Sequence, residues 1–238
     1  MEALFPENPK RPNKGDKLFV VGPPGSHNAY LSNSNMWDAY AQGYRLAADL
    51  LSGHIAESPY HSSLLGYPIV FLYRQYLELR IKELGLAAAE FLAKEYAVPT
   101  DHNLLKLWQG VRADLHEVFA ESAEDLEAVE ERIEEFCSVD PSSYTFRYPA
   151  DTKGKPTLPS APKYVEVDAH GWPIGPPTQP GLKQVDVSHL KQTMQSIAAV
   201  LDGCSDGLYE AQRAKWDAWA EAAHDYEAGD YEPGDYEY

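Results

Sequence analysis

The chain has 238 residues, of which 44% are hydrophobic, and 37 acidic against 20 basic side chains give a formal net charge of −17. The hydrophobic content is ordinary for a folded protein and argues against wholesale disorder. The acidic excess opposes general binding to nucleic acid, because a polyanion needs lysine and arginine to displace its counterions. The chain starts without the basic and apolar regions of a secretory signal, and its most apolar uncharged stretch, Leu64–Tyr73, is about half as long as a membrane span. We therefore expect a cytoplasmic protein that does not enter a membrane.

The cysteines and histidines of the chain do not form the spacings that are typical of metal sites. Cys137 and Cys204 are too few for a disulfide framework or a four-cysteine zinc site. No Cys-x-x-Cys or His-x-x-x-His occurs, and Pro59 separates His54 from His61, so we do not expect these two histidines to share a helical face. The sequence predicts neither a metal site nor a cofactor.

The first half of the chain predicts an extended lead-in over residues 1–33 and a helical bundle core over residues 34–137. The lead-in is rich in Pro, Gly and Asn and holds one strand-like piece, Leu18–Val21. Apolar residues at helical spacing predict a first helix over 34–57 and a second from near His61, with Pro68 expected to kink it or to mark its true start. A separate alanine-rich piece is expected over 87–96.

Two more helices are predicted in the core. The motif Asp101-His102-Asn103 offers a cap for a helix whose apolar stripe runs over 104–118, and His102 is expected to be a capping residue. Ser122-x-x-Asp125 resembles a capping box that opens an acidic helix. The glutamates of that helix are interpreted as its solvated side. Its expected core face is Leu126, Val129, Ile133 and Phe136.

Residues 138–184 are predicted to form a proline-rich excursion from the bundle, since nine of the 18 prolines fall there and exclude a long helix. A short β-hairpin is expected from 164–167 and 172–174, with its turn at 168–171. A long helix over 185–224 then completes the bundle, with Gly203 and Gly207 as expected interruptions. The fold class is therefore mainly α, an antiparallel helical bundle. The expected inner face of the last helix is Leu190, Met194, Ile197, Val200, Leu201, Leu208, Ala211 and Trp216.

Three copies of Asp-Tyr-Glu recur every five residues in the tail, residues 225–238. This period fits neither a helix nor a strand, and Gly229, Pro233 and Gly234 oppose regular structure. We interpret the tail as a flexible strip whose tyrosines fill pockets on a partner protein while its acids meet basic side chains. A solubilising tail without a partner and an internal inhibitor are the alternatives. The predicted partner-binding residues are Asp225, Tyr226, Glu227, Asp230, Tyr231, Glu232, Asp235, Tyr236 and Glu237.

Four segments resemble the HEPN-like helical proteins of bacteria and their mobile elements, in the same order along the chain. They are YPIVFLYRQYLELRIKEL (67–84), HNLLKLW (102–108), FRYPADTKGKP (146–156) and VDVSHLKQTM (185–194). The resemblance covers residues 36–205 and implies an antiparallel bundle of four or more helices, often dimeric, so a homo-oligomer is expected. It also implies a setting of bacterial or phage conflict, such as defence, toxin–antitoxin or counter-defence.

Many members of that superfamily resemble ribonucleases in which four to six residues separate an arginine from a following histidine. Histidine can act as acid or base, while arginine stabilises phosphate charge. The nearest fit here is Lys183, with five residues between it and His189, so the motif is degenerate, and lysine lacks the bidentate geometry of guanidinium. The resemblance leaves a metal-independent ribonuclease as an alternative, with His189 as acid or base, Lys183 or Arg147 at the phosphate, and RNA as substrate. Otherwise His189 is a helix-start residue beside a cap at Ser188.

Two arginines are open to more than one interpretation. Arg74 either forms a helical ion pair with Glu78, four residues later, or contributes to a ligand pocket. Arg147 either anchors the excursion to the bundle or binds a phosphate together with Lys153 and Lys155. We therefore predict a HEPN-like binding or regulatory protein, catalytically degenerate, that engages a partner protein through its tail. A ribonuclease and a small-ligand sensor using Arg74 and Arg147 are the alternatives.

Overall fold

The computed structural model describes residues 11–31, 36–57, 59–159, 166–167, 173–174 and 181–229. The chain divides into two compact units, Met1–Met36 and Trp37–Tyr238. In the first unit, the side chain of Asn28 bonds both the N–H of Gly22, at 2.8 Å, and its carbonyl, at 3.1 Å, which closes a loop. The strand expected at Leu18–Val21 is not formed, because no described segment of this unit pairs with it.

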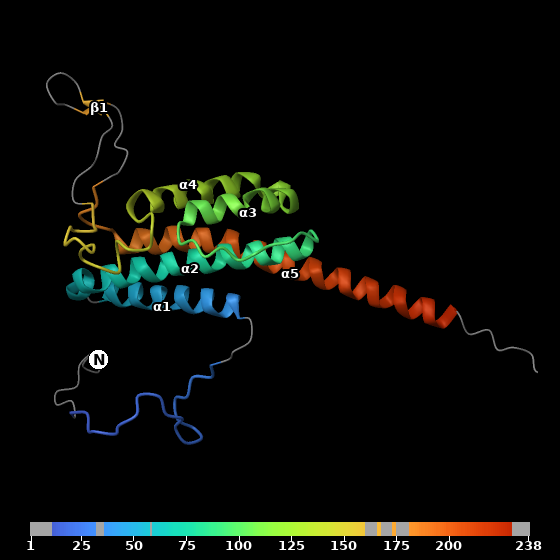
Figure 1. Cartoon of the computed structure of the whole chain (residues 1–238), viewed down its shortest axis with the longest axis horizontal. Coiled ribbons are helices and arrows are strands. Elements are labelled where there is room, and N and C mark those ends of the chain that lie inside the picture. Colours follow the sequence, from blue (N-terminus) through green and yellow to red (C-terminus); the bar gives the residue numbers. More distant parts are fainter. Residues whose placement is uncertain are drawn as a thin grey trace, which may run out of the picture. The chain divides into compact units, whose positions relative to one another are not determined.

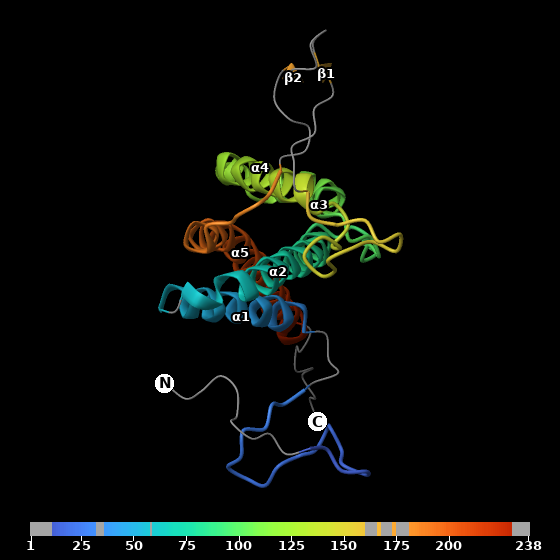
Figure 2. The same cartoon turned by 90° about the vertical axis from the view of Figure 1, so that its left-hand side faces the viewer.

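The second unit is a helical bundle, as the sequence predicts. Its helices lie in three layers, with α1 in one, α2 and α5 in the middle, and α3 and α4 in the third (Figures 1 and 2). Since α2 packs against α1, α3 and α5, the core forms around it, with Tyr73, Tyr76 and Trp108 among its largest fully buried side chains. The antiparallel arrangement of the whole bundle stays a prediction. The elements are α1 (Trp37–Glu57), η1 (Pro59–His61), α2 (Ser62–Phe91), α3 (Leu104–Val118), η2 (Ala120–Ser122), α4 (Ala123–Val139) and α5 (Val187–Gly229).

The central helix α2 is longer than the sequence predicts. It begins at Ser62 and includes Pro68, so Pro68 does not mark its start. It also continues to Phe91, so the separate helix expected over 87–96 is wrong. Alanine has the highest helix propensity, and Ala88 and Ala89 are buried, which extends α2 to its end.

The helix caps differ in part from the expected ones. Asn103, not His102, caps α3, with its side-chain oxygen accepting from the N–H of Lys106 at 3.0 Å. The capping box at Ser122 is wrong, because Ser122 makes no side-chain cap bond. The turn η2 precedes α4, and in it the N–H of Ser122 donates to the carbonyl of Phe119 at 2.9 Å. The predicted core face of α4 is confirmed, with Leu126, Val129 and Ile133 buried and Phe136 packed against the core.

Asp140 holds the start of the excursion, because its Oδ1 accepts from the N–H groups of Tyr144, at 2.8 Å, and Thr145, at 3.1 Å. Further along, β1 (Glu166–Val167) pairs antiparallel with β2 (Pro173–Ile174). These strands lie where the sequence predicts a hairpin, but its turn at 168–171 is outside the described residues, and the complete hairpin stays a prediction.

The last helix, α5, is uninterrupted. It runs through Gly203 and Gly207, so the expected interruptions are wrong. A Cβ on Gly207 would lie 3.1 Å from the ring of Phe119, so glycine allows the close approach of that ring. Trp216 is exposed rather than on the inner face, because the last buried residue of α5 is Leu208. In the part of the chain that the structure describes, no helix is long and apolar enough to cross a membrane.

Candidate functional site

The start of α5 brings two predicted site residues to neighbouring hollows. The first hollow, of about 500 Å³, is lined by Lys183, and the second, of about 640 Å³, by His189. Both side chains are exposed. The two hollows share a wall made by Val70, Phe146, Leu182 and the segment 184–186. A ligand could therefore contact both predicted groups only by extending along this shared wall.

The local charge at His189 is mixed. Asp186 caps α5, since its Oδ1 accepts from the N–H groups of Ser188, at 2.9 Å, and His189, at 3.1 Å. The cap expected at Ser188 is therefore wrong, and a carboxylate takes the favourable position at the positive end of the helix dipole. Arg132 and Glu135 line the same hollow as His189. An incoming phosphate would meet carboxylates here as well as Arg132.

Arg147 does not anchor the excursion to the bundle. It is exposed, its Nη2 donates to the hydroxyl of Tyr148 at 3.0 Å, and its guanidinium lies 5.0 Å from the centre of that ring. Lys153 and Lys155 are also exposed, and their backbone N–H groups donate to Asp151 Oδ1 at 2.8 and 2.9 Å. These cations belong to a surface turn, and none of them lines the hollows at the start of α5.

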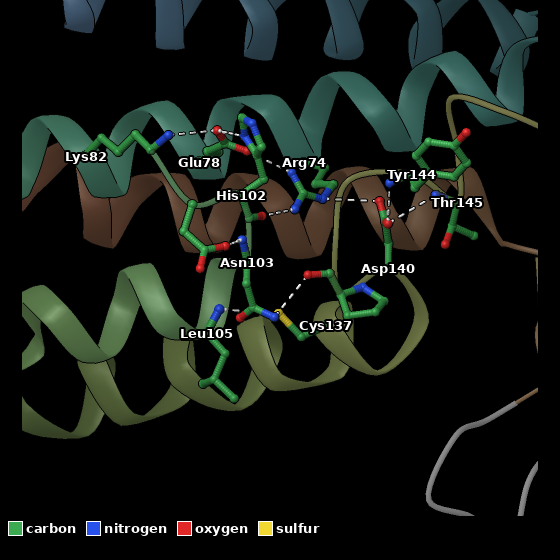
Figure 3. A network of polar contacts seen from close by, with 12 residues as sticks. Arg74, Glu78, Lys82, His102, Asn103, Leu105, Cys137, Asp140, Tyr144 and Thr145 are labelled. Carbon is green, nitrogen blue, oxygen red and sulfur yellow. Dashed lines mark hydrogen bonds and ion pairs between the residues drawn. The ribbon is translucent and has the colours of Figure 1, made fainter. Parts of the chain in front are cut away.

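Arg74 lies at the centre of a buried polar network (Figure 3). Its Nη1 donates to Glu78 Oε2 at 3.0 Å, and its Nη2 donates to the carbonyl of His102. Its Nε lies 3.1 Å from Asp140 Oδ2 and forms an ion pair with it. The predicted pair with Glu78 is present, but Arg74 is 0% exposed, so a ligand has no surface of this side chain to contact.

Glu78 collects three donors in the same network. Besides Arg74, Lys82 Nζ donates to its Oε1 at 2.9 Å, and His102 Nδ1 lies 2.8 Å from the same oxygen. Burial alone would raise the pKa of Glu78, but the hydrogen bonds with His102, Lys82 and Arg74 outweigh it and lower the pKa below its ordinary value. The network ties α2 to the start of α3 and, through Asp140, to the end of α4.

A second buried network was not predicted. Arg80, on another side of α2, contacts Asp38 of α1 at 2.6 Å, Glu83 at 2.9 Å and Asp202 of α5 at 3.0 Å. Ser205 joins it, donating to Glu83 Oε1 at 2.9 Å. The signal in the sequence is the spacing of opposite charges three and four residues apart along an otherwise apolar helix. Both networks neutralise their cations internally.

His54 and His61 lie on separate helices, α1 and η1, and so do not share a helical face, but they still form a pair. Their rings stack with centres 5.3 Å apart, and Nε2 of His54 lies 3.1 Å from Nδ1 of His61. The turn η1 reverses the chain after α1 and returns His61 to the last turn of that helix. Among the residues that the structure describes, no group of three or more His, Cys, Asp or Glu side chains could hold a metal ion.

The C-terminal part of α5 is exposed. Every side chain from Arg213 to Ala222 is exposed, and Trp216 and Trp219 contact each other edge to face with centres 6.0 Å apart. The helix continues to Gly229, so the first Asp-Tyr-Glu copy, at 225–227, is helical rather than irregular. The second and third copies, at 230–232 and 235–237, lie outside the described residues.

No protein-family model, curated protein or solved structure matches the chain. The geometry of the described residues therefore carries the functional argument.

Proposed function

We propose that the chain is a HEPN-like helical binding or regulatory protein, catalytically degenerate, that engages a partner protein through its acidic C-terminal tail. The proposed setting is a cytoplasmic one in bacterial or phage conflict, such as defence or toxin–antitoxin, which the sequence resemblance suggests. The tyrosines of the tail enter pockets on the partner, and its carboxylates meet lysine and arginine there.

The observation that carries this proposal is the exposed end of α5. We call residues 213–229 the arm. Its base is fixed, because Lys215 Nζ donates to the carbonyl of Phe91 at 2.7 Å and lies 3.6 Å from the centre of the Phe91 ring. From there the arm extends past the other helices of the bundle (Figure 1), and its end already contains the first copy of the repeated tail. A helix that projects the tail from the bundle suits capture of a partner better than an internal role.

The charges of the interior support catalytic degeneracy. Arg74 and Arg80 are buried and neutralised by carboxylates, so neither presents a guanidinium to a phosphate. His189 is the histidine nearest to the expected motif. Its backbone N–H donates to the carboxylate of Asp186, an acidic group where the motif would favour a cation. In the hollow that His189 lines, Arg132 is accompanied by the carboxylates of Glu135 and Asp186, which oppose the stabilisation of phosphate charge by that cation.

The test is capture from an extract of the native host by the full chain and by two variants. One variant ends after Ala223, and the other replaces Tyr226, Tyr231 and Tyr236 by alanine. We expect both variants to lose the captured protein while their far-UV circular dichroism stays that of a folded helical bundle. A matched control replaces Tyr30 and Tyr60, which are 98% and 88% exposed outside the tail, by alanine and keeps capture. Equal capture by all four proteins contradicts the proposed role of the tail.

A metal-independent ribonuclease is the second candidate, supported by the neighbouring hollows that Lys183 and His189 line. It is tested by cleavage of a mixed pool of labelled RNAs without added metal. The intact chain and the chain ending after Ala223 are compared, each with and without His189→Ala. Cleavage that His189→Ala abolishes supports this candidate, and cleavage that appears only after truncation makes the tail an inhibitor. No cleavage in any form refutes it. A small-ligand sensor has no comparable support, because Arg74 is buried and Arg147 lines neither hollow.

A further inference from the structure

A stripe with the spacing of a coiled-coil seam runs along the exposed end of α5. Its members, Tyr209, Gln212, Trp216, Trp219 and Ala223, alternate steps of three and four residues. This is the pattern with which one helix packs against another in a two-stranded coiled coil. Tyr209, Trp216 and Trp219 are 54%, 57% and 66% exposed. The pattern is that of a helix–helix interface, but the aromatic side chains are open to solvent.

The stripe begins where α5 still packs on α2 and continues where α2 has ended. At its base, a hollow of about 270 Å³ lies between Ala87 and Glu90 of α2 and Gln212 and Trp216 of α5. Because α2 ends at Phe91, the side chains of the arm beyond Trp216 have no helix of the described chain across from them. The arm is about 25 Å long at 1.5 Å per residue. Most of the stability of a helix in a protein comes from the packing of its apolar face, which the arm lacks in the single chain.

We propose that a second copy of this chain covers the stripe, with the two arms antiparallel. A two-fold axis between the two arms passes midway between Trp216 and Trp219. Trp216 of each copy then packs against Trp219 of the other, and Gln212 of each copy lies opposite Ala223 of the other. The tip of each arm then reaches the hollow at the base of the other. The inference rests on the proposed function, in which the end of α5 is an interaction surface, and names a partner for the arm.

The charge along the arm favours the antiparallel direction. Arg213 and Lys215 lie near the base together with Glu210 and Asp217, and Arg213 Nε lies 3.9 Å from Asp217 Oδ2, whereas the tip holds the acids Glu221, Asp225 and Glu227 without lysine or arginine. The antiparallel register brings Glu221 of one copy next to Arg213 of the other and sets one acidic pair, Asp225 and Glu210, opposite each other. A parallel pair instead places every acid of the arm beside its own counterpart, so the antiparallel direction has the lower repulsion. The same acidic tip opposes insertion of the tryptophans into an anionic membrane surface.

The apolar area is sufficient for a specific but modest interface. A tryptophan buries about 150–250 Å² when fully covered. At the observed exposures, the four indoles of two copies would remove on the order of 500 Å² from water, about half of the ~1,000 Å² that a specific interface needs. Tyr209, Ala223 and the apolar stem of Arg213 border the indoles and supply the remainder. The dimer displays two acidic tails, which raises the avidity for a partner with two sites.

Analytical ultracentrifugation of the full chain over a range of micromolar concentrations tests the proposal. We expect a monomer–dimer equilibrium, and a dissociation constant at least about tenfold weaker for the double variant Trp216→Ala, Trp219→Ala, because truncation of central aromatic anchors costs at least one factor of ten. The matched control is Tyr40→Ala, an exposed aromatic of α1 outside the stripe, which leaves the equilibrium unchanged. A monomer at all concentrations, or a dimer that the double variant leaves intact, overturns the proposal.

Oxidative cross-linking tests the orientation. In the antiparallel dimer, a mixture of chains carrying Gln212→Cys and chains carrying Ala223→Cys forms a disulfide between the two kinds of chain, and neither variant alone cross-links to itself. Self-linking of each variant alone shows a parallel pair and overturns the proposed geometry. The native cysteines give a low background, since Cys204 is buried and Cys137 half-buried.

The outcome is separable from that of the proposed function. A monomeric chain that still captures its partner through residues 225–238 overturns the self-association alone. A dimer whose captured protein does not depend on those residues overturns the proposed function alone.

Discussion

Replacing Arg74 by alanine removes the cation that holds two buried carboxylates. Arg74 is fully buried, pairs with Glu78 at 3.0 Å and Asp140 at 3.1 Å, and donates to the carbonyl of His102. After the change, Glu78 keeps Lys82 and His102, whereas the remaining bonds of Asp140 come from two backbone N–H groups. Asp140 is therefore left as a buried anion without a cation.

We expect Arg74→Ala to lower the free energy of unfolding by about 3–5 kcal/mol, the usual cost of removing one partner of a buried ion pair. This is a large share of the ~5–15 kcal/mol that typical domains have. Urea denaturation followed by far-UV circular dichroism measures it. The matched control is Arg132→Ala, which removes an exposed pair with Glu131 at 3.2 Å and costs about 0–1 kcal/mol.

A second variant separates the loss of charge from the loss of packing. Adding Asp140→Asn to Arg74→Met removes both charges and keeps an amide oxygen for the N–H groups of Tyr144 and Thr145, so part of the stability returns. If Arg74→Ala costs no more than Arg132→Ala, or if Asp140→Asn makes the Arg74→Met protein less stable, the account of this network is wrong.

Two further predictions concern the fold. Gly85→Ala should lower the free energy of unfolding by about 1–3 kcal/mol, because the added Cβ meets the ring of Tyr96 and lies 2.8 Å from Val111 Cγ1. Gly110→Ala is its control, since a Cβ there meets nothing within 4 Å and should stabilise α3 by about 0.5–1 kcal/mol; equal effects of the two changes would contradict the packing at Gly85. Because its pKa in the folded chain is lowered, Glu78 contributes stability that is present above its ordinary value of 4.5 and lost as the pH falls through the folded pKa. Urea denaturation between pH 3 and 6 should therefore show a shallower pH dependence for Glu78→Gln, and an unchanged slope would exclude this contribution.

Helical periodicity predicts the bundle well, because the apolar faces of α3 and α4 repeat at the helical period and are buried as expected. Periodicity does not predict the burial of the charged residues of α2. The spacing of Arg74 and Glu78 predicts an ordinary helical ion pair, since spacing shows that two side chains meet but not whether water reaches them. Their burial depends on the approach of Asp140 and His102 from other segments, which no local pattern reveals.

The errors at the candidate sites have physical causes of the same kind. Trp216 continues the apolar period of α5, but its exposure follows from the end of α2 at Phe91, an event on another helix. Pro59 correctly indicates a break after α1, but no local pattern shows that the turn it begins brings His61 back to His54. The repeated tail was found from sequence alone because a period of five stands apart from both regular structures.

The most direct test of the account is competition by a synthetic peptide of residues 225–238. The full chain is first bound to the protein it captures from its native host, and the peptide is then added in excess. We predict that the peptide displaces the partner, and that a peptide with Tyr226, Tyr231 and Tyr236 replaced by alanine does not. Retention of the partner in the presence of the unaltered peptide, or its equal displacement by the alanine peptide, would contradict the claim that the tail is the binding element.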